Sequence, residues 1–462
     1  MTLLPKIRQG LLNSRHGIRD VAVALIPQGV RVLAGLVTYV SLARGLGPSG
    51  LGQYALCLSV AEVTGQLSEL GLGQTGTRYA SRAYALGDRR GQMAVLRWAF
   101  RMRMAVVLIV SFGVFLVVPQ LTRYLWHDEH LTLLVRTALP MATFLALASV
   151  PITFFLSEKR FGENAIVQVG QALFNLLAVG LLALFGAWTV RAALAVAVLS
   201  TAAGALQFLS RIPKEAWWPS QSDGPRTWGS FWRNPVTKEI PDAANGHRMN
   251  QEKPTEFALF LFLAGLIFMV TGKLDIWLIG HYLDVTQVGV YAAASRLSLP
   301  LGILLAAFNT VLYPRAASTT TLAETRALAA RTFKASLLMA AIGTLYSFIG
   351  PIVIPVVFGH AYRSSVHVAQ LLCFGYSISI LYQPIAQIGY SFGLVRIYWI
   401  ANLAQLVSTS LTLLILLPRV GVLAGAISCT LNSVIGGCII GYLVWNRLRE
   451  DPPTTSLPSP PT

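Results

Sequence analysis

The sequence predicts an all-α polytopic membrane protein of about twelve transmembrane helices, in two pseudo-symmetric six-helix bundles around a central cleft. Three observations lead to this prediction. The 462 residues are 54% hydrophobic and only 12% charged, and their mean hydropathy is +0.60. A soluble domain carries about twice that share of charge. Long apolar stretches recur along the chain, and one short motif occurs twice at a long offset.

A helix needs about 20 apolar residues to cross the hydrocarbon core of a bilayer, where only closed backbone hydrogen bonding is stable. Twelve segments meet this condition, six on each side of one long polar stretch. They are 21–43, 53–74, 102–119, 132–156, 164–186, 190–211, 256–282, 289–313, 335–358, 365–390, 395–417 and 421–445. The predicted organisation is a cytoplasmic N-terminus (1–20), an N-terminal bundle (21–212), a cytoplasmic linker (213–255), a C-terminal bundle (256–446) and a disordered tail (447–462).

Each element has a local reason. The first segment follows about twenty polar, basic residues and is long enough to span, so it is a retained helix and not a cleaved signal. The linker combines mixed charge, Pro and Gly with four tryptophans, which suits a connector whose aromatic rings rest at the headgroup level. The tail is rich in Pro, Ser and Thr, which indicates disorder. Several prolines are expected to kink helices or to mark their ends: Pro27, Pro140, Pro151, Pro300, Pro351, Pro355 and Pro384.

The repeated motif supports the two-bundle arrangement. Residues 46–55 (LGPSGLGQYA) align with 283–292 (LDVTQVGVYA), and each copy follows one long apolar segment and opens another. Later pairs of similar positions keep a comparable offset. Because each half contains six helices, both halves start on the same side, so the repeat is parallel and its axis runs along the membrane normal.

The basic residues predict the orientation. The net charge is +17, which could indicate nucleic-acid binding, but 27 of the 36 lysines and arginines fall on one alternating set of loops. Cytoplasmic loops of membrane proteins carry an excess of Lys and Arg. We therefore expect a multi-pass protein of the bacterial plasma (inner) membrane with both termini cytoplasmic, and no nucleic-acid partner.

Ionisable residues inside predicted spans are functional candidates, since each costs roughly 2.5–3.5 kcal/mol to insert. The basic candidates are Arg31, Lys273 and Arg296, which could form a cationic cleft. The acidic candidates are Glu62, Glu69 and Asp275, which could bind a coupling H⁺ or Na⁺ or act as ion-pair partners. An alternative is that Arg31 pairs with Glu62 or Glu69 to stabilise the bundle. Lys273 and Asp275, two apart on a helix, should each have a separate partner.

Amide side chains within or near the spans form a second set of candidates, which could face sugar hydroxyls along a cleft or hydrogen-bond neighbouring helices. The set is Gln28, Gln66, Gln168, Gln171, Asn175, Asn309, Gln370, Gln383, Gln387, Asn402, Gln405 and Asn432.

These residues resemble a known family. The segment 44–54 (RGLGPSGLGQY), the helix end 69–73 (ELGLG) and Arg78 are similar to the opening of bacterial polysaccharide (O-antigen type) flippases. Asp275, the second motif and Arg296 resemble the start of that family's second half. The family belongs to the multidrug/oligosaccharidyl-lipid/polysaccharide exporter superfamily, whose members often have fourteen helices. The resemblance implies alternating-access transport of an undecaprenyl-diphosphate-linked oligosaccharide to the outer leaflet, for surface polysaccharide such as lipopolysaccharide O-antigen, alongside other polysaccharide assembly proteins.

Two other functions remain open. A cation-coupled multidrug exporter of the same superfamily would favour acidic and aromatic cavity residues. A membrane glycan polymerase or ligase would need acid/base groups on a sizeable outer loop, and the only dense cluster is 127–130 (HDEH). No phosphate-binding loop or paired metal-ligand spacing is apparent. The sequence therefore predicts a transporter and not an enzyme, without a cofactor.

Overall fold

The computed structural model describes residues 3–69, 72–216, 254–317, 322–391 and 395–449, and these residues form helices without any strand. The N-terminal half contains α1 (Leu3–Leu67), α2 (Leu72–Ala85), α3 (Arg89–Leu125), α4 (Leu131–Ala138), α5 (Pro140–Ser157), α6 (Phe161–Leu184), α7 (Val190–Leu209) and the short 3-10 helix η1 (Lys214–Ala216). The C-terminal half contains α9 (Pro254–Tyr282), α10 (Val285–Leu297), α11 (Leu299–Ala317), α12 (Leu322–Ser347), α13 (Gly350–Val357), the 3-10 helix η2 (His360–Tyr362), α14 (Ser365–Ser391), α15 (Val395–Val420) and α16 (Leu423–Arg449).

The all-α membrane fold predicted from the sequence is confirmed. Ten helical segments of the described chain are long and apolar enough to cross a membrane. The first of them, Gly29–Leu67, contains the non-helical Gly47, where two predicted spans meet. Helix α9 is not among the ten, although it coincides with the seventh predicted span. These two places account for the difference between ten segments and the twelve predicted.

Three predicted spans are broken near a proline. The fourth divides into α4 and α5 with Pro140 in the first turn of α5, and the ninth divides into α12 and α13 with Pro351 in the first turn of α13. The eighth divides at Ser298, just before Pro300 of α11. Proline is tolerated in a first helical turn, where its missing N–H would be unpaired anyway. These three prolines mark helix ends, as predicted.

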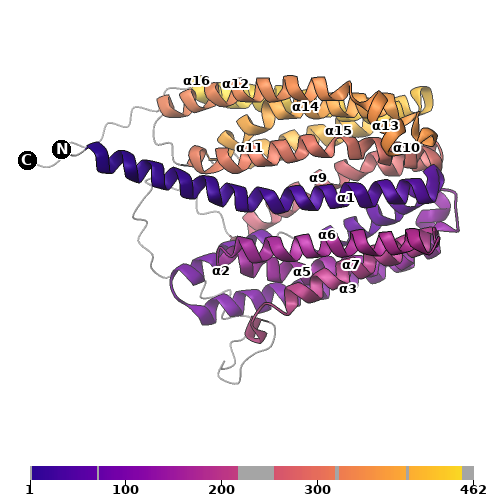
Figure 1. Ribbon diagram of the computed structural model, residues 1–462, viewed down its shortest axis with the longest axis horizontal. Coiled ribbons are helices and arrows are strands. Elements are labelled where there is room, and N and C mark those ends of the chain that lie inside the picture. Colours follow the sequence, from indigo (N-terminus) through magenta and orange to yellow (C-terminus); the bar gives the residue numbers. More distant parts are fainter. Residues whose placement is uncertain (1–2, 70–71, 217–253, 318–321, 392–394, 450–462) are drawn as a thin grey trace, which may run out of the picture.

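The helices run along the long axis of the molecule in two groups (Figure 1). Helices α2 to α7 lie below and α10 to α16 above, and α1 passes between them from the end where the described chain begins at Leu3 and ends at Arg449. Most of the predicted N-terminus (1–20) is helical, because α1 begins at Leu3. The predicted linker is described only at 213–216 and 254–255, and the tail only to Arg449. The division into 21–212 and 256–446 stays a prediction.

The two copies of the repeated motif meet at the end of the molecule opposite the termini. Gly47 has φ 69°, a left-handed conformation suited to glycine, and α1 reverses there. A Cβ atom on Gly52 would lie 1.8 Å from the Val285 carbonyl oxygen, and one on Gly289 would lie 1.8 Å from the Pro48 carbonyl oxygen. Positions 48 and 285 match in the repeat, as do 52 and 289. The contact is therefore reciprocal, as a pseudo-twofold axis requires.

Apolar packing at this crossing joins the halves. Leu51 and Leu56 of α1 and Ala293 of α10 are fully buried in a single hydrophobic cluster. The Trp126 indole N–H donates to the Trp277 carbonyl oxygen at 3.3 Å. Between helices in a bilayer, close van der Waals packing of such side chains stabilises the contact. The halves therefore form one continuous core at this end.

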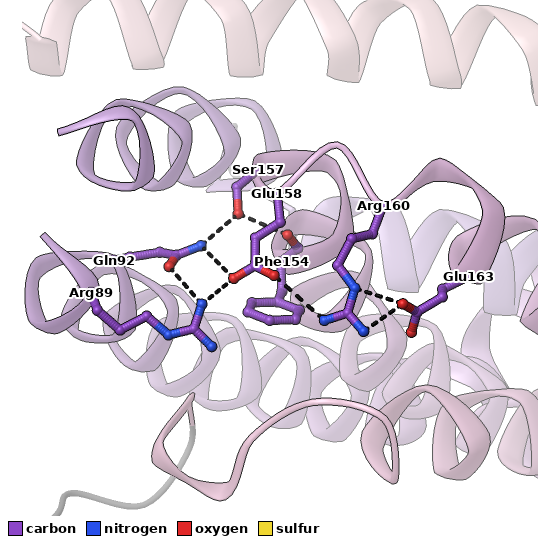
Figure 2. Close-up of polar contacts among 7 residues, drawn as sticks. All are labelled: Arg89, Gln92, Phe154, Ser157, Glu158, Arg160 and Glu163. Atoms are coloured by element: carbon purple, nitrogen blue, oxygen red, sulfur yellow. Dashed lines mark hydrogen bonds and ion pairs between the residues drawn. The ribbon is translucent and has the colours of Figure 1, made fainter. Parts of the chain in front are cut away.

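A polar cluster ties together three helix ends of the N-terminal half (Figure 2). Glu158, at the end of α5, has a side chain that is only 8% exposed and accepts from Arg89 at the start of α3. Its other carboxylate oxygen lies 3.4 Å from the Arg160 guanidinium. Both guanidinium groups also lie over the Phe154 ring. A nearly buried carboxylate is thus compensated by two cations, which buried charge requires.

Neutral and acidic partners complete this cluster. The Gln92 amide is buried and donates to the Ser157 hydroxyl at 3.1 Å and to Glu158 at 3.3 Å. Arg160 also donates to Glu163 at 2.6 Å, and this hydrogen bond raises the pKa of the Arg160 guanidinium. The cluster therefore links the ends of α3, α5 and α6 to one another.

Candidate functional site

A cavity of about 400 Å³ lies between α1 and helices of the C-terminal half. The part of α1 after Gly47 supplies one wall, and α9 and α10 supply the next. Helices α14, α15 and α16 supply the remaining wall. Four of the six sequence-predicted candidates line this cavity: Glu62, Lys273, Asp275 and Arg296.

Lys273 and Glu62 form an ion pair across the two halves. The Lys273 Nζ atom on α9 lies 2.6 Å from Glu62 Oε2 on α1, and the two side chains are 28% and 39% exposed. One turn away on α1, the Ser59 hydroxyl accepts from the Trp277 indole N–H at 2.7 Å. These contacts hold α9 against α1 beside the cavity, and the charged pair remains open to it.

Asp275 has a different partner from Lys273, as its two-residue spacing predicts. The Tyr291 hydroxyl of α10 donates to Asp275 Oδ2, and the Ile276 backbone N–H donates to Oδ1 at 2.8 Å. Tyr291 belongs to the second copy of the repeated motif and is itself buried. The motif tyrosine therefore positions a carboxylate on the cavity wall.

Arg296 lies in the cavity with an aromatic partner. Its guanidinium carbon lies 4.2 Å from the centroid of the buried Tyr39 ring. Among the described residues, it forms an ion pair with no carboxylate. Arg296 also hydrogen-bonds the Tyr39 side chain, and a guanidinium has five N–H donors, so others stay open to an anion. Arg296 can thus accept an anion without first giving up a salt bridge.

The other two candidates do not belong to the described lining of this cavity. Arg31 is exposed on α1 and donates to the Gln168 amide oxygen of α6 at 2.7 Å. Glu69 lies at 3.8 Å from the Arg103 guanidinium of α3 and accepts from Gln66. The structure therefore brings Lys273 and Arg296 to one cavity and places Arg31 against the N-terminal half.

The place of Arg103 in the structure differs from the loop position that the charge pattern assigned to it. The charge pattern counts it with the loop residues, but α3 begins at Arg89, so Arg103 lies well inside a helix and its side chain is only 8% exposed. Burying a charge without a partner costs free energy, and Glu69 supplies the carboxylate that compensates the Arg103 guanidinium. Its signal in the sequence was its position inside the predicted span 102–119.

Neutral polar groups cover the wall opposite α1. Four of the amides singled out in the sequence line it: Gln383, Asn402, Gln405 and Asn432. Hydroxyls of Ser379, Thr409, Ser428 and Ser433 lie among them. The buried Asn432 Oδ1 and Thr409 Oγ1 atoms have no hydrogen-bond partner among the described residues. Amides and hydroxyls both donate and accept hydrogen bonds, so this wall suits a ligand rich in hydroxyls.

Aromatic residues that were not predicted complete the cavity. Tyr39, Tyr54, Tyr376 and Tyr382 line it together with Tyr291. Tyr54 and Tyr291 occupy matching places in the two motif copies, two residues after the crossing glycines. That match was visible in the sequence, but the role of the tyrosines in a cavity wall was not.

The cluster 127–130 considered for catalysis is engaged in local contacts. The His127 ring stacks on His281 of α9 with centroids 5.4 Å apart. Asp128 accepts from the His130 backbone N–H, and Glu129 lies 3.5 Å from Arg123. These contacts are typical of a loop that closes a helix end.

Comparison with known proteins gives the following similarities. The family model for polysaccharide biosynthesis proteins matches residues 18–320. The structure is similar to the lipid II flippase MurJ in an inward closed conformation, with 13% identity, 91% of this chain and 87% of that chain covered, and a TM-score of 0.70. It is also similar to a multidrug resistance MATE family transporter of the MOP superfamily in an inward-facing conformation (14% identity, 93% and 98% covered, TM-score 0.64). A Vibrio cholerae MATE transporter gives 12% identity, coverage of 94% and 97%, and a TM-score of 0.63. No curated protein sequence matches the chain.

Proposed function

This chain belongs to the polysaccharide biosynthesis protein family, and from that premise we propose that it carries a lipid-linked oligosaccharide across the bilayer by alternating access. The cargo class is an oligosaccharide on an undecaprenyl-diphosphate type lipid. The fold, shared with MurJ and MATE transporters, supports a transporter, in which two halves move about a central site. Enzymatic activity is not part of the proposal.

One observation carries the cargo class. The cavity combines Arg296, which forms no ion pair with a described carboxylate, with a wall of amides and hydroxyls. A diphosphate needs cationic hydrogen-bond donors when it leaves water, and sugars need neutral donors and acceptors. The two parts of the cavity thus correspond to the two parts of the cargo. Lys273 and, on the opposite half, Arg31 would extend the cationic path.

Deleting the gene is expected to leave lipid-linked oligosaccharide on the cytoplasmic leaflet and to reduce surface polysaccharide, because synthesis continues while transport stops. The measurement is accessibility of the glycan to an added glycosidase in sealed, oriented vesicles, alongside staining of surface polysaccharide. Complementation with the intact gene should reverse both effects. Unchanged surface polysaccharide would contradict the proposal.

A cation-coupled multidrug exporter is the second candidate. It is favoured by Glu62 and Asp275 in the cavity and by the similarity to MATE structures. It predicts greater sensitivity of the deletion strain to cationic dyes with normal surface polysaccharide. The same strain therefore distinguishes the two candidates.

We propose the bacterial inner membrane as the location, with both termini in the cytoplasm. The support is the excess of basic residues on one set of loops. Single cysteines at Ser49, Asp128 and Asp284 should react with an impermeant maleimide added outside intact cells. Those at Gly87 and Lys159 should react only after permeabilisation. Labelling of Gly87 in sealed cells would contradict this orientation.

A further inference from the structure

A second concave site lies at the end of the C-terminal half opposite the termini, where α13 is found (Figure 1). It is a groove of about 410 Å³ between α13, η2 and the start of α14. Its lining is Pro351, Ile352, Pro355, Val356, His360, Arg363, Val366 and His367. None of these residues lines the cavity that contains Arg296.

One wall of the groove is apolar and faces outward. Ile352 and Val356, one turn apart on α13, are 69% and 68% exposed. Leu345 and Phe348, near the end of α12, are also 70% and 68% exposed. In a membrane protein, such a surface contacts acyl chains, not water. The groove is therefore open to the bilayer.

The rim of the groove is basic. His360, Arg363 and His367 are all exposed, and His367 Nδ1 lies 3.3 Å from the Gln370 amide oxygen. Arg363 forms no ion pair with a described carboxylate. The chain contains no Asp or Glu between Glu324 and Glu450, so no acidic residue of α13 or α14 offsets this charge. The rim thus offers a guanidinium and two imidazoles to an anion.

The segment that carries the rim is held firmly in place. Gly359 has φ 99°, which lets the chain turn sharply out of α13. The Tyr362 ring is buried, packs on Phe358, and its hydroxyl donates to the Ala43 carbonyl oxygen at 2.9 Å. Arg44 of α1 donates to the Val356 and Val357 carbonyl oxygens at 2.5 and 2.8 Å. The groove is therefore preformed, which lowers the entropic cost of binding.

We propose that this groove binds the headgroup of an anionic phospholipid. The phosphate lies against Arg363, with His360 and His367 as further donors, and an acyl chain follows the wall of Ile352 and Val356. A guanidinium binds phosphate oxygens through charge-assisted hydrogen bonds, which lipid headgroups offer at either membrane surface. The apolar wall selects a lipid over a soluble anion, because only a lipid covers both surfaces.

The test measures lipid binding to the purified full-length protein by native mass spectrometry, with phosphatidylglycerol and phosphatidylcholine as probes. We expect one tightly bound phosphatidylglycerol, with Arg363→Ala weakening it by about tenfold, the size of one charge-assisted hydrogen bond. Arg363→Lys should keep part of the affinity. The matched control is Arg419→Ala, which removes an exposed arginine at the end of α15 and outside the groove, and should change affinity less than twofold.

Three results would overturn the proposal: equal affinity for the two lipids, equal losses in the Arg363 and Arg419 variants, or displacement of the bound lipid by excess inorganic phosphate. Arg363 is exposed, so its loss should not prevent folding, and a monodisperse elution profile checks this for each variant. Photo-crosslinking with a phosphatidylglycerol analogue should label peptides of α13 and α14. Labelling confined to other helices would also contradict the assignment.

Discussion

Replacing Arg296 by Gln is expected to reduce transport of the lipid-linked oligosaccharide by at least about tenfold, with normal abundance in the membrane. Arg296 lines the cavity between α1 and the C-terminal half, stacks on Tyr39 and pairs with no described carboxylate. Its removal therefore strands no opposite charge. A lost hydrogen bond to a charged phosphate costs about 1.5–3 kcal/mol, which corresponds to a factor of ten or more. Arg296→Lys should keep part of the activity, because it keeps the charge but loses the planar fork.

The measurement is flipping of lipid-linked oligosaccharide in proteoliposomes, with membrane abundance followed by immunoblotting. Arg331→Gln is the matched control, because Arg331 is an exposed arginine of α12 outside the described cavity lining. Full activity of the Arg296→Gln protein would rule out this residue as a phosphate ligand. Activity and abundance falling in parallel would assign it a structural role instead.

The neighbouring charges are tested in the same assay. Lys273→Gln leaves Glu62 without its partner, so some loss of abundance is expected. Adding Glu62→Gln should restore abundance but not transport if Lys273 binds cargo, and should restore both if the pair is only structural.

Arg31→Gln should lower transport if the cationic path reaches the N-terminal half. If Asp275 couples transport to H⁺ or Na⁺, Asp275→Asn should remove the dependence on that gradient.

Replacing Gly289 by Ala is expected to open the contact between the halves at the end opposite the termini. The new Cβ atom would lie 1.8 Å from the Pro48 carbonyl oxygen, whereas ordinary contacts begin near 3.4 Å. Because the Pro48 oxygen belongs to the backbone, no flexible side chain can move aside, and the two helices must separate. Gly52→Ala should have the same effect, since it meets the Val285 carbonyl oxygen at 1.8 Å. Elsewhere in a helix, Gly→Ala stabilises by roughly 0.5–1 kcal/mol.

Spin labels at Ser49 and Thr286, which flank the crossing, report the separation by pulsed electron resonance. We expect a longer distance distribution in the Gly289→Ala protein and slower transport, because the proposed alternating-access cycle needs the two halves to meet at this end. Gly302→Ala on α11 is the control, since nothing lies within 4 Å of its added Cβ. The double variant of Gly52 and Gly289 should be less than additive, because both positions belong to one contact. An unchanged distance would show that the crossing tolerates a Cβ.

The repeated motif shows how much of this site could be read from the chain. Its glycines and tyrosines stood out as a repeat, and each has a physical role: the glycines meet at the crossing, and the tyrosines line the cavity two residues later. The sequence could not indicate that the two copies touch each other. Contact between residues more than two hundred positions apart depends on how the halves pack.

For the candidate charged residues, the sequence located each one but not its partner. Hydropathy alone located Arg31, Lys273, Arg296 and the three carboxylates in apolar segments, because charge is rare and costly there. Their partners depended on the register and rotation of each helix, which a single sequence with short motifs does not fix. Thus Glu62 pairs with Lys273 of α9, and Glu69 lies beside Arg103 of α3. The charge pattern of the sequence had counted Arg103 among the loop residues.

The sequence by itself determined the membrane class, the all-helical fold, the family resemblance and the two-copy motif. Each follows from local properties of the sequence: the length of its apolar segments, the need for closed backbone hydrogen bonding in lipid, and the positions of glycine and proline at helix ends. Only the tertiary structure decided where the cavity lies, which two cations share it, and that a basic groove forms between α13 and α14. These features form where side chains from helices far apart in the sequence lie side by side, and the packing of the helices decides which side chains meet.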